Sequence, residues 1–203
     1  MRQTLAAAGF DIVQPFDGAL VDRGAGNESR RLHDRPERRA GLLIGNTRTL
    51  WPAFLANKPA GADPLERYVE QHIEPLVPAG GRVFYAHRTY DGAFLPFQQL
   101  AVAAGLGAIS ETHLVIHPEY GPWFALRAAI VVPGAPPPSA QIPRPCRCGA
   151  PCREALARAV AGDDDWRAWL AVRDACPIGR QHRYSEDQLA YHYIQGLLRT
   201  PAG

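Results

Sequence analysis

The residue types best suited to metal or redox chemistry are four cysteines in the last third of the chain. Cys146, Cys148 and Cys152 form a Cys-x-Cys-x3-Cys group, and Cys176 precedes a proline. A secreted disulfide scaffold spreads its cysteines through a short chain, whereas the first 145 residues here contain none. Four thiolates could hold one tetrahedral zinc ion or one Fe-S cluster, while two [4Fe–4S] clusters would need eight. Because the spacing is not a standard one for metals, free thiols are the open alternative.

A second candidate group lies in the segment Ala104–Pro133, AGLGAISETHLVIHPEYGPWFALRAAIVVP. Gly105 and Gly107 would let the backbone approach a flat or bulky ligand, although a helix end followed by a tight turn also accounts for them. His117, at an expected strand end, is followed by Gly121 and an aromatic residue. The alternative for this part is a hairpin with a satisfied histidine.

Several elements would have to position these groups. The segment Asp17–Ala40, rich in charged residues and glycine, is expected to be a solvated loop, and Gly41–Gly45 a buried strand. A helix should begin at Asp63, with a proline in its first turn and Glu66 completing a capping box. Arg82–Ala86 is expected to be a strand. The core-facing stripe of that helix consists of Leu65, Val69, Ile73 and Leu76.

The pattern continues with a helix over Leu95–Ala104. His113–His117 and Trp123–Val132 are expected to be strands, joined by a turn over Pro118–Pro122. Pro133–Pro145, rich in Pro, Gly and Ala, should be an extended connector.

The cysteine region should lead into helices over Arg153–Ala161 and Trp166–Val172. Ser185 and Gln188 form an apparent capping box for a last helix. Strands and helices are mixed without a strict βαβ alternation, which favours an α+β class. The apolar face of the last helix consists of Leu189, Tyr193 and Leu197.

Bulk properties limit the class of function. The formal net charge is +2, with 22 basic and 20 acidic residues, which gives no general signal for nucleic acid. No segment approaches the roughly 20 apolar residues that a membrane span needs. The N-terminal residues lack the apolar region of a secretory signal, so a cytoplasmic protein is expected.

The segment Ala104–Pro133 resembles the corrin-binding core shared by epoxyqueuosine reductases, reductive dehalogenases and cobalamin-processing proteins of the CblC type (cyanocobalamin reductase/alkylcobalamin dealkylase). His117 and the run Trp123–Arg127 favour the CblC type. The resemblance extends to Ala8–Phe16, to the helix after Asp63, to Trp166–Ala175 and to Arg183–Gln188. It implies a modified flavin-nitroreductase-like fold, with a central, mainly antiparallel sheet flanked by helices.

That resemblance also implies two parts. Residues 1–140 would form the nitroreductase-like core that binds cobalamin (vitamin B12). Residues 141–203 would form a Cys-containing, helical extension packed on the same domain. Corrin contacts would come from Gly105, Leu106, Gly107, Ala108, Ile109, His117, Gly121, Trp123 and Phe124.

The implied activity is removal of the upper axial ligand of base-off cobalamin, by reductive decyanation or by glutathione-dependent dealkylation. Arg127, Arg183 and Arg153 would hold glutathione, since a guanidinium binds a carboxylate bidentately. Asp91 lies where epoxyqueuosine reductases carry a candidate proton donor, although an Asp in a turn is the alternative. Together with Arg127 it completes the implied catalytic set.

Three other readings remain open at this stage. The chain could be a non-catalytic cobalamin carrier, a corrin-dependent reductase with one residual metal or Fe-S site, or a plain flavin nitroreductase. Electrons would come from a flavin (FMN or FAD), a thiol, a cluster held by the four cysteines, or a partner reductase. A carrier would hand its cargo to a cobalamin-dependent enzyme.

Overall fold

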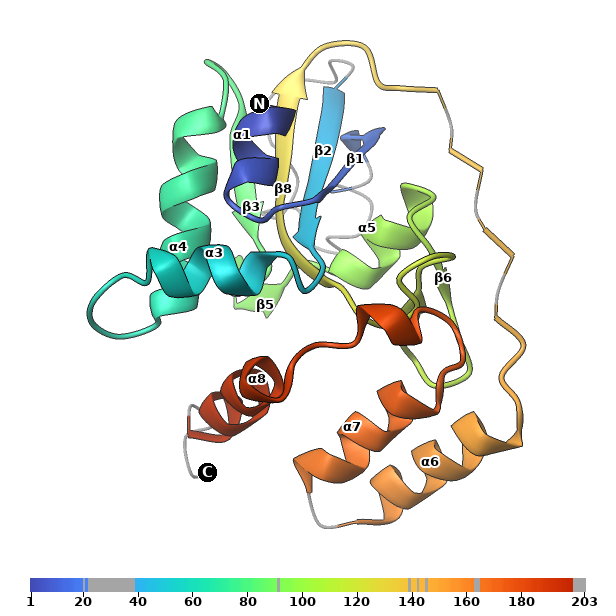
Figure 1. The fold of residues 1–203 in the computed structure, drawn as a ribbon. Helices are drawn as coiled ribbons and strands as arrows, with labels where there is room; N and C mark the ends of the chain where they lie inside the picture. The colour runs from blue at the N-terminus through green and yellow to red at the C-terminus, as the bar shows by residue number, and fades with distance from the viewer. Residues whose placement is uncertain are drawn as a thin grey trace.

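The computed structural model describes residues 1–19, 21, 39–90, 92–138, 140–141, 143–144, 146–162 and 165–198. Its centre is a four-stranded sheet in the order β1-β2-β8-β3, and every neighbouring pair in it is antiparallel (Figure 1). The strands are β1 (Ile12–Asp17), β2 (Arg39–Asn46), β3 (Arg82–Tyr85) and β8 (Ala125–Pro133). The long pairing of β2 with β8 forms the middle of the sheet.

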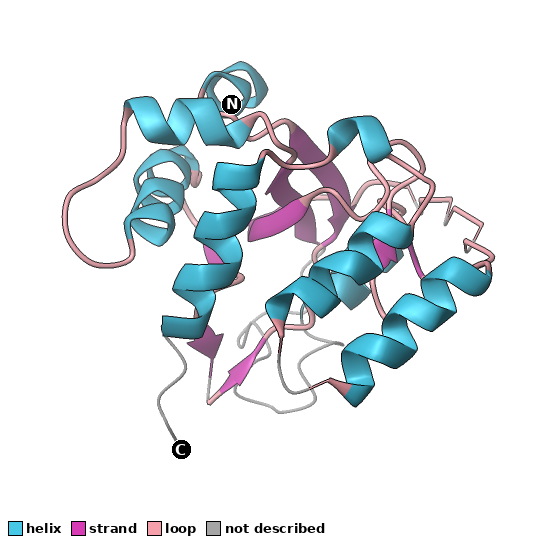
Figure 2. Ribbon diagram, turned by 60° about the horizontal axis from the view of Figure 1, so that its bottom comes forward, coloured by secondary structure: helices cyan, strands magenta, loops and turns pink. Residues whose placement is uncertain are grey.

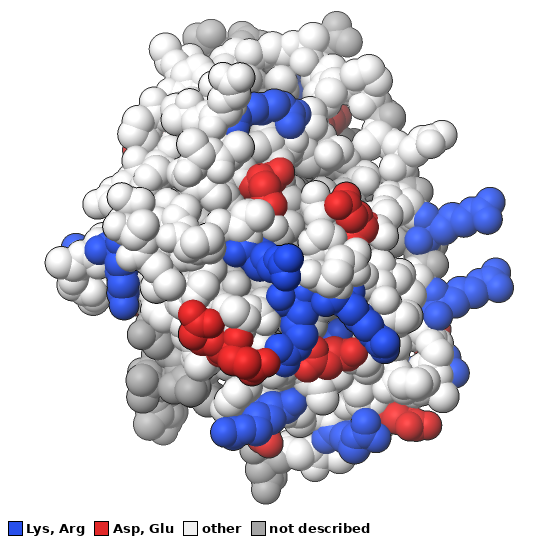
Figure 3. Space-filling model, in the orientation of Figure 1, with Lys and Arg blue, Asp and Glu red and all other residues white. Residues whose placement is uncertain are grey.

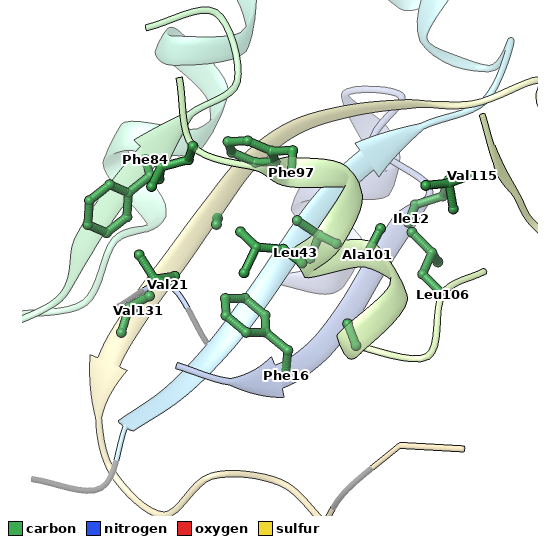
Figure 4. Close-up of a cluster of buried hydrophobic side chains, with 14 residues drawn as sticks. Ile12, Phe16, Val21, Leu43, Phe84, Phe97, Ala101, Leu106, Val115 and Val131 are labelled. Atoms are coloured by element: carbon green, nitrogen blue, oxygen red, sulfur yellow. The ribbon is translucent and has the colours of Figure 1, made fainter. Parts of the chain in front are cut away.

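Both faces of the sheet are buried. Successive residues of each strand point to opposite sides, and each side packs into its own hydrophobic cluster. Leu43, Ala129 and Val131 belong to a cluster that includes Phe97 and Ala101 of helix α5 (Phe97–Ala103; Figure 4). Their neighbours Ile44, Ala128 and Ile130 belong to the cluster on the other face. Helices that contribute to that second cluster are α1 (Arg2–Ala7), α3 (Leu50–Ala56) and α4 (Pro64–Ile73).

The remaining helices follow the connector after β8. Helices α6 (Ala150–Ala161) and α7 (Trp166–Ala175) lie side by side (Figure 1 and Figure 2) and pack through small apolar residues. Helix α8 (Glu186–Leu198) meets α3, where Trp51 Nε1 donates to Asp187 Oδ2 at 2.7 Å. Shorter elements are η2 (Glu74–Leu76), β4 (Thr89–Tyr90), β5 (Ala93–Phe94), β6 (Ala108–Ile109), β7 (Val115–Ile116) and η3 (Arg180–His182).

These elements confirm the expected α+β class with a central antiparallel sheet flanked by helices. The strands predicted at Gly41–Gly45 and Arg82–Ala86 are present, as is the helix after Asp63. The helix predicted over Leu95–Ala104 begins two residues later, after Pro96. The division into a core of residues 1–140 and an extension of residues 141–203 packed on the same domain stays a prediction.

Local expectations were wrong at four places. The strand predicted over His113–His117 shrinks to two residues, because His113 has a left-handed φ of 60° that ends an extended run. Asp63 caps α4 without a side-chain hydrogen bond, and the buried amide of Gln188 reaches no partner among the described residues, so neither capping box forms. Val21, inside the expected loop, is fully buried in the core. Residues 20 and 22–38 of that loop and the Leu197 side chain lie outside the described residues.

Candidate functional site

Two adjoining hollows lie where β8 begins. The larger, of about 380 Å³, has a mainly apolar wall. The smaller, of about 180 Å³, includes Glu66 and Arg127, and both hollows share Ala86 and Leu126. We call the two together the cleft. Residues lining the larger hollow are Ala86, Phe97, Gln98, Leu114, Val115, Pro122, Phe124, Leu126, Arg173 and Tyr193. They come from α5, β7, β8, α7 and α8, so the cleft exists only in the folded chain.

The turn from His117 to Gly121 precedes the strand that floors the cleft. Its ends are joined by two backbone hydrogen bonds of 2.9 Å. His117 Nδ1 accepts the backbone N–H groups of Glu119 and Tyr120 at 3.1 and 3.2 Å, and the imidazole stacks on the Tyr120 ring at 4.4 Å. Burial lowers the pKa of His117, which keeps the ring neutral. The neutral ring therefore carries its proton on Nε2.

A segment after α7, Cys176–Gly179, crosses this turn; we call it the strap. Gly121 and Gly179 both have left-handed φ values, 57° and 74°, and each faces the other segment's backbone. A Cβ on Gly121 would lie 1.9 Å from the Ile178 carbonyl oxygen, and one on Gly179 would lie 2.2 Å from the Tyr120 carbonyl carbon. Only glycine permits both the conformation and the contact at this crossing.

Arg127 on β8 is the buried cation of the smaller hollow, which Glu66 also lines, and the two side chains interact electrostatically. Its Nε donates to Asn46 Oδ1 at 2.6 Å, while its Nη2 is buried and has no hydrogen-bond partner among the described residues. Burial lowers the pKa of Arg127, although a guanidinium stays charged at neutral pH. A buried cationic donor without an acceptor is costly, so this nitrogen is suited to an anionic ligand group.

Arg173 on α7 supplies a second guanidinium, in the wall of the larger hollow. It donates through Nη2 to the Pro122 carbonyl oxygen and lies 4.6 Å from the Trp123 ring centre and 5.1 Å from that of Tyr184. Sequence reasoning did not select it. The available signal was its position three residues after buried Leu170, on the inward side of α7.

Solved structures of other proteins share the fold of this chain. A solved structure of a Caenorhabditis elegans B12-trafficking protein, CblC, superposes on 94% of this chain and 87% of its own, with a TM-score of 0.66 and 17% identity. The chain has the fold of CblC. An epoxyqueuosine reductase from Bacillus subtilis matches less well, with a TM-score of 0.50 over 90% of this chain and 66% of its own at 14% identity.

Sequence comparison points the same way over a shorter stretch. The chain is 37% identical over 76 residues to the human protein named cyanocobalamin reductase/alkylcobalamin dealkylase, and 34% identical to the bovine one. Those residues are 37% of this chain and 26% of each relative, so the match spans about a quarter of the relatives' length. No protein-family model matches the chain. The resemblance to CblC-type proteins predicted from the sequence is confirmed.

Within the CblC fold, the residues predicted to contact a corrin lie in different surroundings. Phe124 lines the larger hollow, whereas Trp123 is 1% exposed and packs on Tyr184 at 5.7 Å in a separate core cluster. His117 and Gly121 form the turn beneath the strap. None of the residues Gly105, Leu106, Gly107, Ala108 and Ile109 lines either hollow.

Local packing explains the two glycines of that stretch. A Cβ on Gly107 would lie 2.7 Å from the Ile116 carbonyl oxygen, across the small β6–β7 pair. Gly105, with φ of 72°, faces Ala140 and Gln141 of the connector, again at 2.7 Å. Their role as corrin contacts stays a prediction, since the space beside each is filled by the chain itself.

The other two arginines predicted for glutathione are engaged elsewhere. Arg183 donates from Nε to Asp174 at 2.7 Å and also pairs with Glu186, contacts that raise its pKa. Arg153 donates to the Cys148 carbonyl oxygen at 2.6 Å. Of the three, only Arg127 lines the cleft. Asp91 lies outside the described residues, between β4 and β5 in the sequence.

A group of buried polar atoms lies behind the cleft. Among the described residues, Trp123 Nε1, Gln188 Oε1 and Nε2, and His192 Nε2 have no hydrogen-bond partner, like Arg127 Nη2. The Tyr184 ring neighbours two of these side chains, with centroids 5.7 Å from Trp123 and 5.8 Å from His192. Each unpaired buried group costs about 1–3 kcal/mol, so ordered water or a ligand is expected among them.

His192→Phe should make the protein less sensitive to acid. Burial, with Arg127 and Arg173 nearby, lowers the pKa of His192 to about 3, against about 6.5 in an unfolded chain. Between these values the unfolded state binds the proton and the folded state does not. Stability therefore falls as the pH drops below about 6.5, by about 1.4 kcal/mol at about pH 5.5.

Urea unfolding of both proteins at neutral pH and near pH 5.5 measures this difference. His192→Phe should lose that much less stability on acidification than the wild type. His113→Asn is the control, at an exposed residue whose positive φ asparagine tolerates. An equal acid loss in His192→Phe and wild type would show that His192 is not buried as described.

Surface features add little to the site. On the face shown in Figure 3, Lys and Arg side chains interleave with Asp and Glu rather than forming a field of one sign. None of the helices in the described part of the chain combines the length and the apolarity that crossing a bilayer requires.

Proposed function

We propose that this chain binds base-off cobalamin at the cleft and removes its upper axial ligand, as an enzyme of the CblC type. The observation that carries the proposal is a pair of guanidiniums, Arg127 and Arg173, lining the adjoining hollows of a mainly apolar cleft in a CblC fold. The relatives' printed name, cyanocobalamin reductase/alkylcobalamin dealkylase, supplies the reaction class. The nitroreductase-like ancestry of the fold belongs to the same proposal.

The apolar wall suits the hydrocarbon edge of a corrin. Phe124, Phe97 and Leu114 present carbon surface to the larger hollow. A whole corrin is larger than this hollow, so we expect it to cover the cleft and the His117 turn with only part inserted. Contact with Gly105 would require the connector at Ala140–Gln141 to move aside.

The two guanidiniums suit a thiol that carries carboxylates, such as glutathione. Charge-assisted hydrogen bonds from Arg127 Nη2 and Arg173 would orient the thiol, and their positive charge favours its thiolate. Attack of the thiolate on a cobalt-bound alkyl carbon forms a thioether. The electron pair of the cobalt–carbon bond then stays on cobalt, which leaves as Co(I). Reductive loss of cyanide instead needs electrons from a reduced flavin, a thiol or a partner reductase.

The first test is the absorbance of cyanocobalamin and methylcobalamin when the purified chain is added. We expect the spectral change of base-off binding, and Phe124→Ala should weaken binding about tenfold, or about 1.4 kcal/mol. Phe94→Ala is the matched control, because Phe94 is 60% exposed and lines neither hollow.

Adding glutathione or a reduced flavin then separates the possible functions. Loss of the upper ligand with turnover supports the enzyme. Stoichiometric binding with the ligand retained would indicate a carrier that hands cobalamin to a cobalamin-dependent enzyme. An unchanged spectrum with no measurable affinity for either cobalamin would contradict every corrin-based function.

A further inference from the structure

The four cysteines converge on one place although they come from three segments. Cys146 and Cys148 lie between the connector and α6, Cys152 lies in the first turn of α6, and Cys176 is the C-cap of α7. The Cys148 thiol interacts with those of Cys146, Cys152 and Cys176. All the cysteines of the chain therefore meet beside the strap.

The surroundings of these sulfurs are buried and contain amide donors. Cys148, Cys152 and Cys176 are 7%, 4% and 5% exposed, and none of the four forms a disulfide. The Gly149 backbone N–H donates to the Cys152 sulfur, and the Ile178 N–H donates to that of Cys176. Amide donors to sulfur stabilise thiolates and are common around metal-bound cysteines.

Geometry brings the cysteines of α6 and of the strap together. The Cys152 thiol donates to the Ala175 carbonyl oxygen at 3.6 Å, directly beside Cys176. Packing alone does not call for four sulfurs at one point, because α6 and α7 already pack through Ala155, Ala159 and Val172.

We propose that the four cysteines bind one zinc ion as a tetrahedral tetrathiolate site. Tetrahedral Zn–S bonds of about 2.3 Å place neighbouring sulfurs about 3.8 Å apart, close to thiols in contact. A zinc ion needs only the four thiolates that this chain supplies, whereas an Fe-S cluster also needs inorganic sulfide. Binding of Zn²⁺ releases the four thiol protons and involves no electron transfer.

Zinc binding has to tighten the cluster. As the described side chains lie, no group of three or more His, Cys, Asp or Glu residues is arranged to hold a metal ion. Cys176 comes from another part of the chain than the other three, at the end of α7, so we expect it to move toward them on binding. Because Cys176 begins the strap, the ion would fix the strap against the Gly121 turn. The proposed site does not depend on cobalamin.

Metal analysis of protein purified without chelator tests the proposal. We expect one zinc per chain by mass spectrometry, and four thiols that react with Ellman's reagent only after chelation. Cadmium added to the stripped protein should give a thiolate-to-cadmium ultraviolet band that saturates at one equivalent. Cys148→Ser and Cys176→Ser should each lose the zinc, while Val160→Ser, at an exposed position of α6, should keep it.

Three results would overturn the zinc site. The folded chain could take up no zinc when zinc is supplied, or it could contain iron and acid-labile sulfide in place of zinc. A disulfide among the four cysteines in freshly purified protein would be the third such result. If a serine variant fails to fold, the cadmium titration and thiol count of the wild-type chain still decide the question. Cobalamin absorbance is measured separately, so a failure of the zinc site and a failure of the proposed function are distinguishable.

Discussion

Gly121→Ala should lower the free energy of unfolding by about 2–4 kcal/mol. The new Cβ would lie 1.9 Å from the Ile178 carbonyl oxygen, in a residue that already needs a φ of 57°. The strap must then leave the turn, and cobalamin affinity should fall as the turn loses its cover. Urea unfolding and the cobalamin absorbance titration measure the two effects.

Gly92→Ala is the matched control for backbone strain. Gly92 has a φ of 78°, but nothing lies within 4 Å of its absent Cβ, so only the conformational cost of about 1 kcal/mol applies. Gly179→Ala should resemble Gly121→Ala, and the double variant should cost less than the sum, because the same crossing is lost once. A Gly121→Ala protein as stable as Gly92→Ala would show that the strap does not cross the turn as described.

Arg173→Gln should reduce glutathione-dependent dealkylation of methylcobalamin by about 10–100-fold in kcat/KM for the thiol. The change removes a charge-assisted hydrogen bond to a carboxylate while leaving the apolar wall of the cleft in place. Cobalamin affinity should therefore stay near that of the wild type. The rate with 2-mercaptoethanol, which has no carboxylate, should change far less than the rate with glutathione.

Arg153→Gln is the control for Arg173→Gln, because Arg153 is implied by sequence resemblance but lies outside the cleft. Arg153 bonds to the Cys148 carbonyl oxygen and lines neither hollow, so this variant should keep the glutathione rate. An Arg173→Gln enzyme that loses equal activity with both thiols would point to a general structural defect. Full activity in Arg173→Gln with a loss in Arg153→Gln would place the thiol elsewhere.

The helices and strands were predictable where an apolar pattern coincides with a clear signal for the start or end of the element. Helix α4 has a buried stripe at Leu65, Val69 and Ile73 and a proline in its first turn. The apolar run of β2 and the longer one of β8 become neighbouring central strands, buried on both faces. Sequence did not predict the break at His113, because its positive φ is imposed by a turn closed with Ser110.

The site was predictable only in part. Arg127 follows from the resemblance of the run Trp123–Arg127, and it lines the smaller hollow, while its role toward glutathione stays a prediction. Arg173 was missed because its role depends on α7 packing beside Pro122 and Trp123, a contact between segments far apart in sequence. Arg183 was predicted to bind glutathione because the residues around it resemble CblC-type proteins. Its guanidinium instead pairs with two carboxylates of this chain, Asp174 and Glu186.

The strap also bears on the order in which the chain can mature during synthesis. The His117–Gly121 turn is made before the residues that cover it, since Ile178 and Gly179 are translated later. A nascent chain that ends before the strap therefore exposes the turn and lacks Arg173. The cleft therefore becomes complete only once α7 and the strap have left the ribosome and docked.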